Sequence, residues 1–216
     1  MLFGAWGGLA ALAALVTAVP GIAETPYEAR VLAALNFARA QPVAYAETLK
    51  RYRTYYRAKL VSPPGAEEDV ETVEGVRPVD EAIAFLTRRP AIATVAPGNT
   101  LAAAATDHAA QQAHSGAIGH GGDDGSSPSD RAERRGGGPY VAEAIMYGAA
   151  DADDVVRQLI IDDGVADRGH RTILFEAHLH FAGVACRPHP SYRTVCVIDL
   201  ADTPDGREQG YRVAAR

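Results

Sequence analysis

The chain has 216 residues, of which 47% are hydrophobic, and a formal net charge of −6. This length and composition favour one globular domain with a sizeable core over a disordered chain. The densest basic run, 131–135, is diluted by Asp130 and Glu133, so the composition excludes the basic surface typical of nucleic-acid binding. We therefore expect no nucleic-acid partner.

The first 23 residues carry no charged side chain and predict a secretory signal peptide. An apolar run from Leu9 to Val19 precedes small residues at Gly21 and Ala23, the −3 and −1 positions of a cleavage site after Ala23. The run is too short to predict a membrane span, and an uncleaved N-terminal anchor is the alternative. We expect a secreted or periplasmic monomer with no stable membrane span after cleavage.

Proline residues and apolar spacing predict the first helices. Pro26 opens one helix, which ends or restarts at Pro42, and a second helix covers 43–57. The segment 60–76 is acidic and contains no basic residue, so it is expected to be an exposed loop. A short helix follows over 78–88.

The middle of the chain predicts two further helices around a long loop. Asn99 or Thr100 is expected to cap an alanine-rich helix over 101–114, on which His108 is interpreted as a half-buried, hydrogen-bonded histidine. The segment 115–139 is rich in Gly, Ser and Asp and predicts a loop. A helix capped by Asp151 then runs to a stop at Gly164.

The C-terminal region predicts a hairpin. Segments 181–185 and 194–200 have the β-branched or alternating pattern of strands. Cys186 and Cys196 flank the turn between them, and for an exported protein a disulfide is the favoured interpretation over two buried thiols. From residue 203 onward a polar tail, 203–216, is expected to fray.

Candidate site residues lie in three separated stretches. His120 is surrounded by glycines, which allow backbone to approach a neighbour or ligand closely. Glu143 stands alone in an apolar run, where a carboxylate needs a histidine, an arginine or a metal as partner. His170 lies between Arg168 and Arg171. Two imidazoles and a carboxylate therefore predict a polar binding cleft.

Two acidic residues follow the predicted helix that begins after Asp151. Asp162 and Asp163 would lie at its C-terminus, where the helix dipole disfavours negative charge. Cationic partners are expected, and Arg168 and Arg171 follow closely in the sequence. We interpret Asp163 as part of a local clamp with these arginines and place Asp162 nearer the cleft.

An ordered series of motifs covers nearly the whole chain after residue 23: Leu35-Asn36-Phe37-Ala38-Arg39, Leu101 with the His108 helix, His120-Gly121-Gly122-Asp123-Asp124-Gly125, Arg131, Ala142-Glu143-Ala144-Ile145, Gly169-His170-Arg171, Gly183-Val184-Ala185 and Val197-Ile198-Asp199. In this order the motifs resemble the CAP superfamily of cysteine-rich secretory, antigen 5 and pathogenesis-related 1 proteins, including its bacterial secreted members. The resemblance assigns 24–202 to one CAP domain.

The resemblance implies an α+β fold, a three-layer α-β-α sandwich with a central antiparallel sheet. It also implies a cleft with two histidines and two acids, which map to His120, His170 and, for the first acid, Glu143. The second acid of the family usually follows an aromatic residue on the helix before the last histidine. This chain has Leu159 there, and Asp162 is the candidate for the fourth position.

Two functional hypotheses follow from the resemblance and from the residues. The first is a non-enzymatic binding module for a lipid or other small hydrophobic ligand, with a cleft for a divalent metal such as Zn²⁺ held by His120 and His170. The alternative is a metal-assisted hydrolase of the peptidase or esterase kind, with Glu143 or Asp162 as general base. A third interpretation is a polar cluster that only locks loops together.

Overall fold

The computed structural model describes residues 26–65 and 68–210. The predicted signal peptide, 1–23, and the end of the predicted tail, 211–216, lie outside the described residues. The helices are α1 (Tyr27–Ala40), α2 (Pro42–Arg53), α3 (Arg77–Arg88), α4 (Asn99–Ser115), α5 (Pro128–Arg134), α6 (Ala152–Ile161) and α7 (Gly169–Leu174). The strands are β1 (Tyr56–Arg57), β2 (Leu60–Val61), β3 (Val70–Glu71), β4 (Ala96–Pro97), β5 (Ala142–Tyr147), β6 (Phe181–His189) and β7 (Arg193–Ala201).

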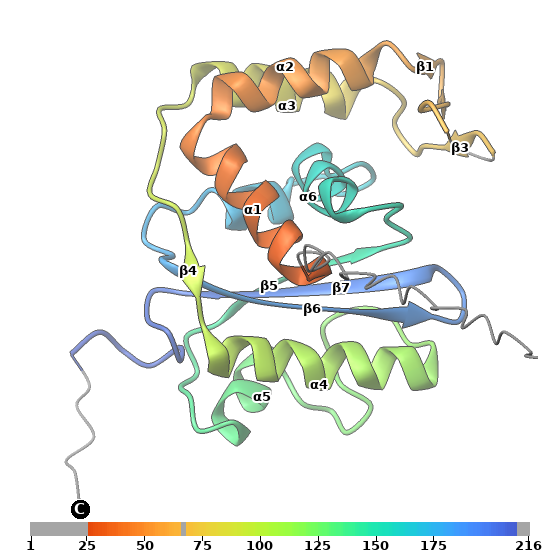
Figure 1. Cartoon of the computed structure of the whole chain (residues 1–216). Coiled ribbons are helices and arrows are strands. Elements are labelled where there is room, and N and C mark those ends of the chain that lie inside the picture. The colour runs from red at the N-terminus through yellow and green to blue at the C-terminus, as the bar shows by residue number, and fades with distance from the viewer. Residues whose placement is uncertain (1–25, 66–67, 211–216) are drawn as a thin grey trace, which may run out of the picture.

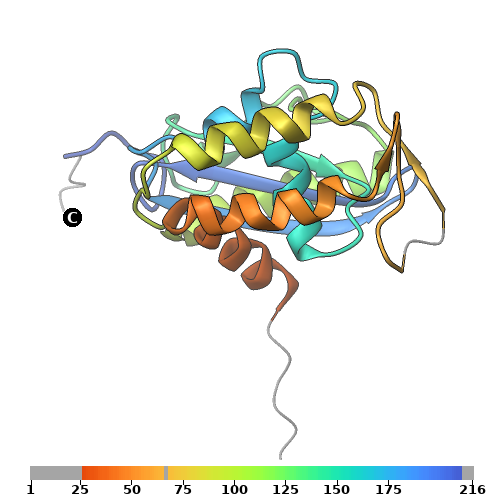
Figure 2. The same ribbon diagram turned by 90° about the horizontal axis from the view of Figure 1, so that it is seen from above.

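The central sheet has the strand order β4-β6-β7-β5. The three long strands pair antiparallel, and the two-residue strand β4 adds to β6 in parallel. Helices α4 and α5 cover one face of this sheet, while α1 and α6 cover the other and α2 and α3 lie outside them (Figures 1 and 2). The α+β class and the α-β-α layering expected from the sequence are confirmed.

Close approach of α4 to the sheet depends on small residues. Ala104, Ala105 and Ala109 are buried on the helix side. On the sheet side, a Cβ added to Gly183 would lie 2.0 Å from the backbone nitrogen of Ala102. Any larger residue at Gly183 would therefore push the helix away from β6.

Helix α6 is stabilised by a side-chain cap at its N-terminus and by an apolar face that is buried in the core. The Asp151 side chain accepts a hydrogen bond from the backbone N–H of Asp154 at 2.7 Å, as the sequence predicted. Val155, Val156 and Ile160 are fully buried in the core. The helix ends earlier than expected, because Asp162 already takes the left-handed conformation after Ile161, with a φ of 61°, two residues before Gly164.

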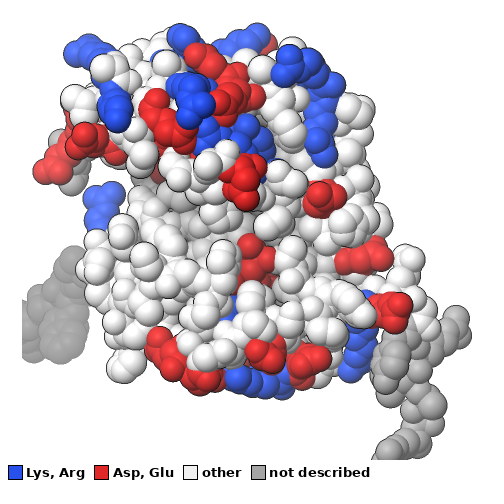
Figure 3. Space-filling view, turned by 180° about the vertical axis from the view of Figure 1, so that it is seen from behind, with Lys and Arg blue, Asp and Glu red and all other residues white. Residues whose placement is uncertain are grey.

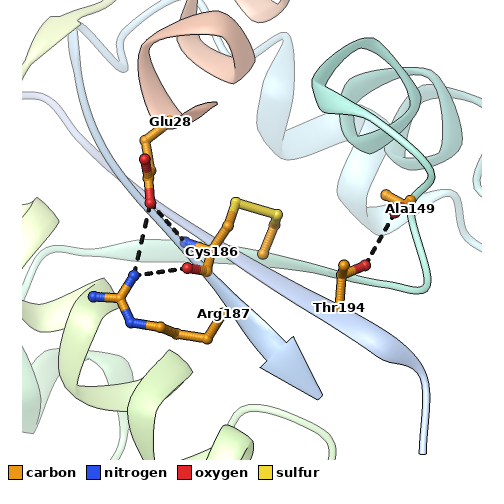
Figure 4. Close-up of a disulfide and its surroundings, with 6 residues drawn as sticks. Glu28, Ala149, Cys186, Arg187 and Thr194 are labelled. Carbon is orange, nitrogen blue, oxygen red and sulfur yellow. Dashed lines mark hydrogen bonds and ion pairs between the residues drawn. A yellow bond between two sulfur atoms is a disulfide. The ribbon is translucent and has the colours of Figure 1, made fainter. Parts of the chain in front are cut away.

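The β6–β7 hairpin carries the predicted disulfide (Figure 4). Cys186 lies directly opposite Cys196 in the antiparallel register, with 4.1 Å between their Cα atoms. The strands extend beyond the predicted 181–185 and 194–200 because backbone pairing continues through the polar residues to the turn. Thr194 donates a hydrogen bond to the Ala149 carbonyl at 3.0 Å, which ties the hairpin to the loop before α6.

Three expectations for helices and loops need correction. The predicted helix 43–57 ends at Arg53, and the following residues form the small sheet β1-β2-β3, which occupies part of the predicted acidic loop. Helix α4 begins at Asn99 after Gly98, without a side-chain cap. The predicted loop 115–139 contains α5, whose capping box joins Ser127 to Asp130.

The prediction that the tail frays from residue 203 is wrong for 203–207. The carbonyl of Asp205 accepts a hydrogen bond from Gly138 N–H, and that of Gly206 accepts one from Tyr140 N–H, each at 2.9 Å. These bonds satisfy backbone groups of the segment between α5 and β5. Within 26–65 and 68–210, no helix is both long enough and apolar enough to cross a bilayer.

Candidate histidine–carboxylate cleft

The predicted site residues gather at the edge of the sheet formed by β5. This edge faces away from the viewer in Figure 1, and Figure 3 shows the molecule from that side. Charged side chains gather over the upper and lower parts of this face, and a band of uncharged residues with isolated acidic groups crosses its middle (Figure 3). His120 follows α4, Glu143 lies on β5, and Asp162 and His170 flank the connection from α6 to α7.

Glu143 links the histidine loop to helix α5. Its side chain is 1% exposed; its Oε1 lies 2.8 Å from His120 Nδ1, and its Oε2 accepts a hydrogen bond from Arg131 Nη2 at 2.7 Å. Arg131, also 1% exposed, donates through Nη1 to the carbonyls of His120 and Ser126 at 3.1 and 2.9 Å. The buried carboxylate thus has both the histidine and the arginine that its apolar surroundings require.

Asp162 binds His170 as Glu143 binds His120. Its Oδ1 lies 2.7 Å from His170 Nδ1, and its Oδ2 accepts the backbone N–H groups of His170 and Arg171 at 3.0 and 3.3 Å. The left-handed backbone at Asp162 reverses the chain after α6, which turns its side chain toward the start of α7. Asp162 is 2% exposed at its side chain, whereas His170 is 23% exposed.

The two imidazoles lie side by side, with their ring centroids 6.5 Å apart and their planes tilted by 38°. A carboxylate can only accept hydrogen bonds, so Nδ1 is the protonated nitrogen of each neutral ring. The lone pair then resides on Nε2 of His120 and of His170. The structure therefore brings together all four residues that the sequence proposed for the cleft.

A third acidic residue lies beside Glu143 in the sheet. Asp199 on β7 is fully buried and stands directly opposite Glu143 in the β5·β7 register. Burial raises the pKa of Asp199 well above its ordinary value, and the nearby Glu143 carboxylate raises it further, while Arg131 acts against both. The folded protein therefore favours the protonated form of Asp199, and Arg131 forms the buried ion pair with Glu143.

The expected roles of the arginines near His170 are wrong. Arg168 pairs with Glu74 and Glu81, at 2.6 and 2.9 Å, and not with Asp163. Asp163 accepts backbone N–H groups of the segment before α3, from Val73 and Glu74. Partners from so far away in the sequence replace the local clamp because α3 packs against α6.

Arg171 is buried, and its guanidinium donates to the backbone carbonyls of Ile160, Ile161 and Pro78. Its side chain thus caps the C-terminal end of α6, where carbonyls lack helical partners. Only its backbone N–H contacts Asp162. The two arginines beside His170 in the sequence therefore hold the ends of α6 and α3.

Sequence reasoning gave no site role to Arg131 or Asp199, although both lie in the motifs of the resemblance. Each of these two residues nevertheless has one local feature that could have indicated a role in the site. Arg131 sits one residue after the capping box of α5, so its side chain leaves the first turn of a fixed helix. Asp199 is a charged residue within an apolar strand, the pattern that also drew attention to Glu143.

His120 and His170 are the two residues of this site that could hold a divalent metal. A carboxylate on the far nitrogen of each ring is the usual outer contact of metal-binding histidines, since it fixes the ring and its tautomer. Within 26–65 and 68–210, no cluster of three or more His, Cys, Asp and Glu ligands is found. His120 and His170 would therefore be the protein ligands, and water or a bound molecule would complete the coordination.

The chain is thus a layered α-β-α domain with two carboxylate-anchored histidines at one edge of its sheet. A scan against family models matches residues 70–200 to the CAP family, described as the cysteine-rich secretory protein family. The match covers more than half of the chain, and the chain belongs to this family. Searches of curated proteins and of solved structures find no match.

Proposed function

We propose that this CAP domain is a secreted, non-enzymatic binding module whose cleft holds a divalent metal such as Zn²⁺ between His120 and His170. One observation carries the proposal: two adjacent imidazoles, each held at Nδ1 by a nearly fully buried carboxylate. This arrangement fixes the orientation of both rings, which lowers the cost of ordering them around a metal. The disulfide between Cys186 and Cys196 supports secretion, because disulfides persist in oxidising compartments.

The arrangement of the carboxylates favours binding over hydrolysis. A metal-assisted hydrolase needs a base with an oxygen free to take a proton from water. Glu143 uses Oε1 for His120 and Oε2 for Arg131, and Asp162 uses Oδ1 for His170 and Oδ2 for backbone N–H groups. Both candidate bases are thus engaged in holding the histidines.

A separate hollow supports a small hydrophobic ligand. It measures about 530 Å³ and lies between α1 and α6, away from the histidines, with Ala33, Ala34, Phe37 and Ala152 on its walls. Arg30, Asp151 and Asp153 also line it. An apolar floor with charged groups beside it suits a lipid chain with a polar head.

Calorimetric titration of the metal-free protein with Zn²⁺ tests the metal site. We expect binding that is lost in His120→Ala and in His170→Ala. His180→Ala is the matched control, since His180 is exposed and pairs with Asp202, which is not one of the site carboxylates. Equal Zn²⁺ affinity in all four proteins would refute the metal proposal.

A fluorescent fatty acid tests the hollow. Ala33→Trp would fill it from the exposed side of α1, and Ala44→Trp, at an exposed alanine of α2, is the control. We expect the first substitution alone to abolish binding. Hydrolysis of peptide or ester substrates that depends on both His120 and His170 would instead establish the enzymatic alternative.

A further inference from the structure

The backbone of Gly119, the residue before His120, is held by three side chains from two elements. Its N–H donates to Tyr147 Oη at 2.8 Å. Its carbonyl accepts from Gln112 Nε2 at 2.6 Å and lies 2.8 Å from His108 Nε2, which also lies 3.0 Å from Gln112 Nε2. In the tautomer with its proton on Nε2, His108 donates to this carbonyl. Tyr147 Oη in turn donates to Gln112 Oε1 at 3.0 Å, which closes a ring of hydrogen bonds.

This hydrogen-bonded ring is built from the interior of the protein. His108 and Gln112 are 0% and 1% exposed and lie one turn apart on α4, while Tyr147 ends β5. Tyr147 shares a strand face with Glu143, four residues earlier. Burial raises the pKa of Tyr147, so its hydroxyl stays protonated and remains a donor. We call His108, Gln112 and Tyr147 the Gly119 clamp.

The clamp binds the backbone of a glycine, the residue type with the greatest conformational freedom. Gly119 takes a φ of +94°, a conformation open to glycine, and no atom lies within 4 Å of where its Cβ would be. The N–H and carbonyl of Gly119 are both hydrogen-bonded, and Arg131 binds the His120 carbonyl. The backbone is therefore held in one conformation on both sides of the His120 side chain. The imidazole itself is 52% exposed, so packing alone does not orient it.

We propose that His108, Gln112 and Tyr147 are positioning residues. They hold the backbone so that the His120 ring contacts Glu143 and lies beside the His170 ring. The proposal rests on the proposed function of this cleft but concerns the protein without metal. Removing one clamp hydrogen bond frees the Gly119 backbone, and His120 then samples orientations in which Glu143 does not hold Nδ1. Such outer contacts of a metal-binding histidine typically change metal affinity by about 10–100-fold.

Nitrogen-15 NMR of the full chain with labelled histidines tests the clamp in the absence of metal. The parent protein should show His120 with its proton on Nδ1. Tyr147→Phe removes only the hydroxyl and should give His120 a mixture of tautomers, with His170 unchanged because Asp162 holds it separately. Tyr192→Phe is the matched control, because its ring packs against Tyr147. It should leave both histidines as they are.

Zn²⁺ titration of the same variants gives the second measurement. Tyr147→Phe should weaken affinity about 10–100-fold, and Tyr192→Phe less than about twofold. A folded Tyr147→Phe protein with the parent His120 tautomer overturns the clamp. A fixed His120 tautomer in a parent protein that binds no Zn²⁺ would refute the metal proposal and leave the clamp standing.

A second pair of variants covers the outcome in which Tyr147→Phe does not fold. His108→Gln retains a donor for the Gly119 carbonyl, and His108→Leu does not. The clamp predicts the parent His120 tautomer in the glutamine variant and a mixture in the leucine variant. The same His120 signal in both variants, or failure of both to fold, overturns the positioning role in favour of a purely structural one.

Discussion

Asp199 stands directly opposite Glu143 across the β5·β7 ladder, so two carboxyl groups share one buried site with the single guanidinium of Arg131. Side chains at opposed positions of an antiparallel pair lie about 5 Å apart. Burial raises the pKa of Asp199, and the nearby Glu143 carboxylate raises it further. Arg131 therefore pairs with Glu143, while the site favours the protonated form of Asp199.

Asp199→Asn should stabilise the protein at neutral pH. Asp199 binds its proton more tightly in the native state than in the unfolded chain, where its ordinary pKa is 3.8. The stability of the parent therefore falls as the pH rises from 3.8 toward the raised pKa of the native state. Asparagine does not ionise and escapes this loss. We expect the variant to gain on the order of 1 kcal/mol at pH 7 and nothing near pH 3.

Urea denaturation at several pH values measures this gap, with Asp153→Asn, at an exposed position of α6, as the control. The control should differ from the parent by a similar small amount at every pH. A difference between Asp199→Asn and the parent that stays constant with pH would contradict the raised pKa of Asp199.

Arg131→Met should be strongly destabilising, because it leaves the buried Glu143 carboxylate without its cation. Breaking a buried pair in this way costs about 3–5 kcal/mol. Arg134→Met on the same helix breaks an exposed pair with Asp124 and should cost less than about 1 kcal/mol. Chemical denaturation of both variants decides the point, and equal losses would show that Arg131 is not needed to balance Glu143.

Glu74 should contribute to acid sensitivity. Hydrogen bonds from Arg168 and from the Gly164 N–H lower its pKa from 4.5 to about 2. A lowered pKa means that its stabilising contribution is present above about pH 4.5 and is lost as the pH falls toward 2. Glu74→Gln should flatten the melting temperature against pH in this range, whereas Glu71→Gln on exposed β3 should follow the parent curve.

Loss of the Cys186–Cys196 disulfide should lower stability by about 2–3 kcal/mol, the chain-entropy value for a loop of this length. The double serine variant should unfold at lower denaturant concentration than the oxidised parent. The reduced parent should match the variant, because both lack the same restraint. A reduced parent as stable as the oxidised one would show that hairpin pairing alone holds β6 and β7 together.

Most elements of the fold could be predicted because their signals are local. Apolar spacing placed α1 and α3, Asp151 marked the start of α6, and alternation around the cysteines marked the β6–β7 hairpin. The sequence does not predict β5, because its six residues, which are apolar except for Glu143, lack the alternation typical of a strand. Helix α5 was missed because glycine and serine around it outweighed the short capping signal at Ser127.

The candidate site was predicted from residue types and from the family resemblance, and its members do converge. The partners of the charged residues were not predictable in the same way. Arg168 was expected to pair with acids close to it in the sequence, but Glu74 and Glu81 lie beside it because α3 packs near α6. Closeness in the sequence therefore does not predict ion pairs when the fold brings a distant carboxylate beside the arginine.

By itself, the sequence determined the class of fold, the disulfide and the four residues of the cleft, because each depends on composition, spacing or a motif. Only the tertiary structure decided which carboxylate holds which imidazole, that Arg131 and Asp199 complete the charge balance, and that a clamp on Gly119 stands behind His120. These relationships depend on strand register and on the packing of α4 against the sheet. Both arise from the sum of many contacts between distant segments, which no local stretch of sequence encodes.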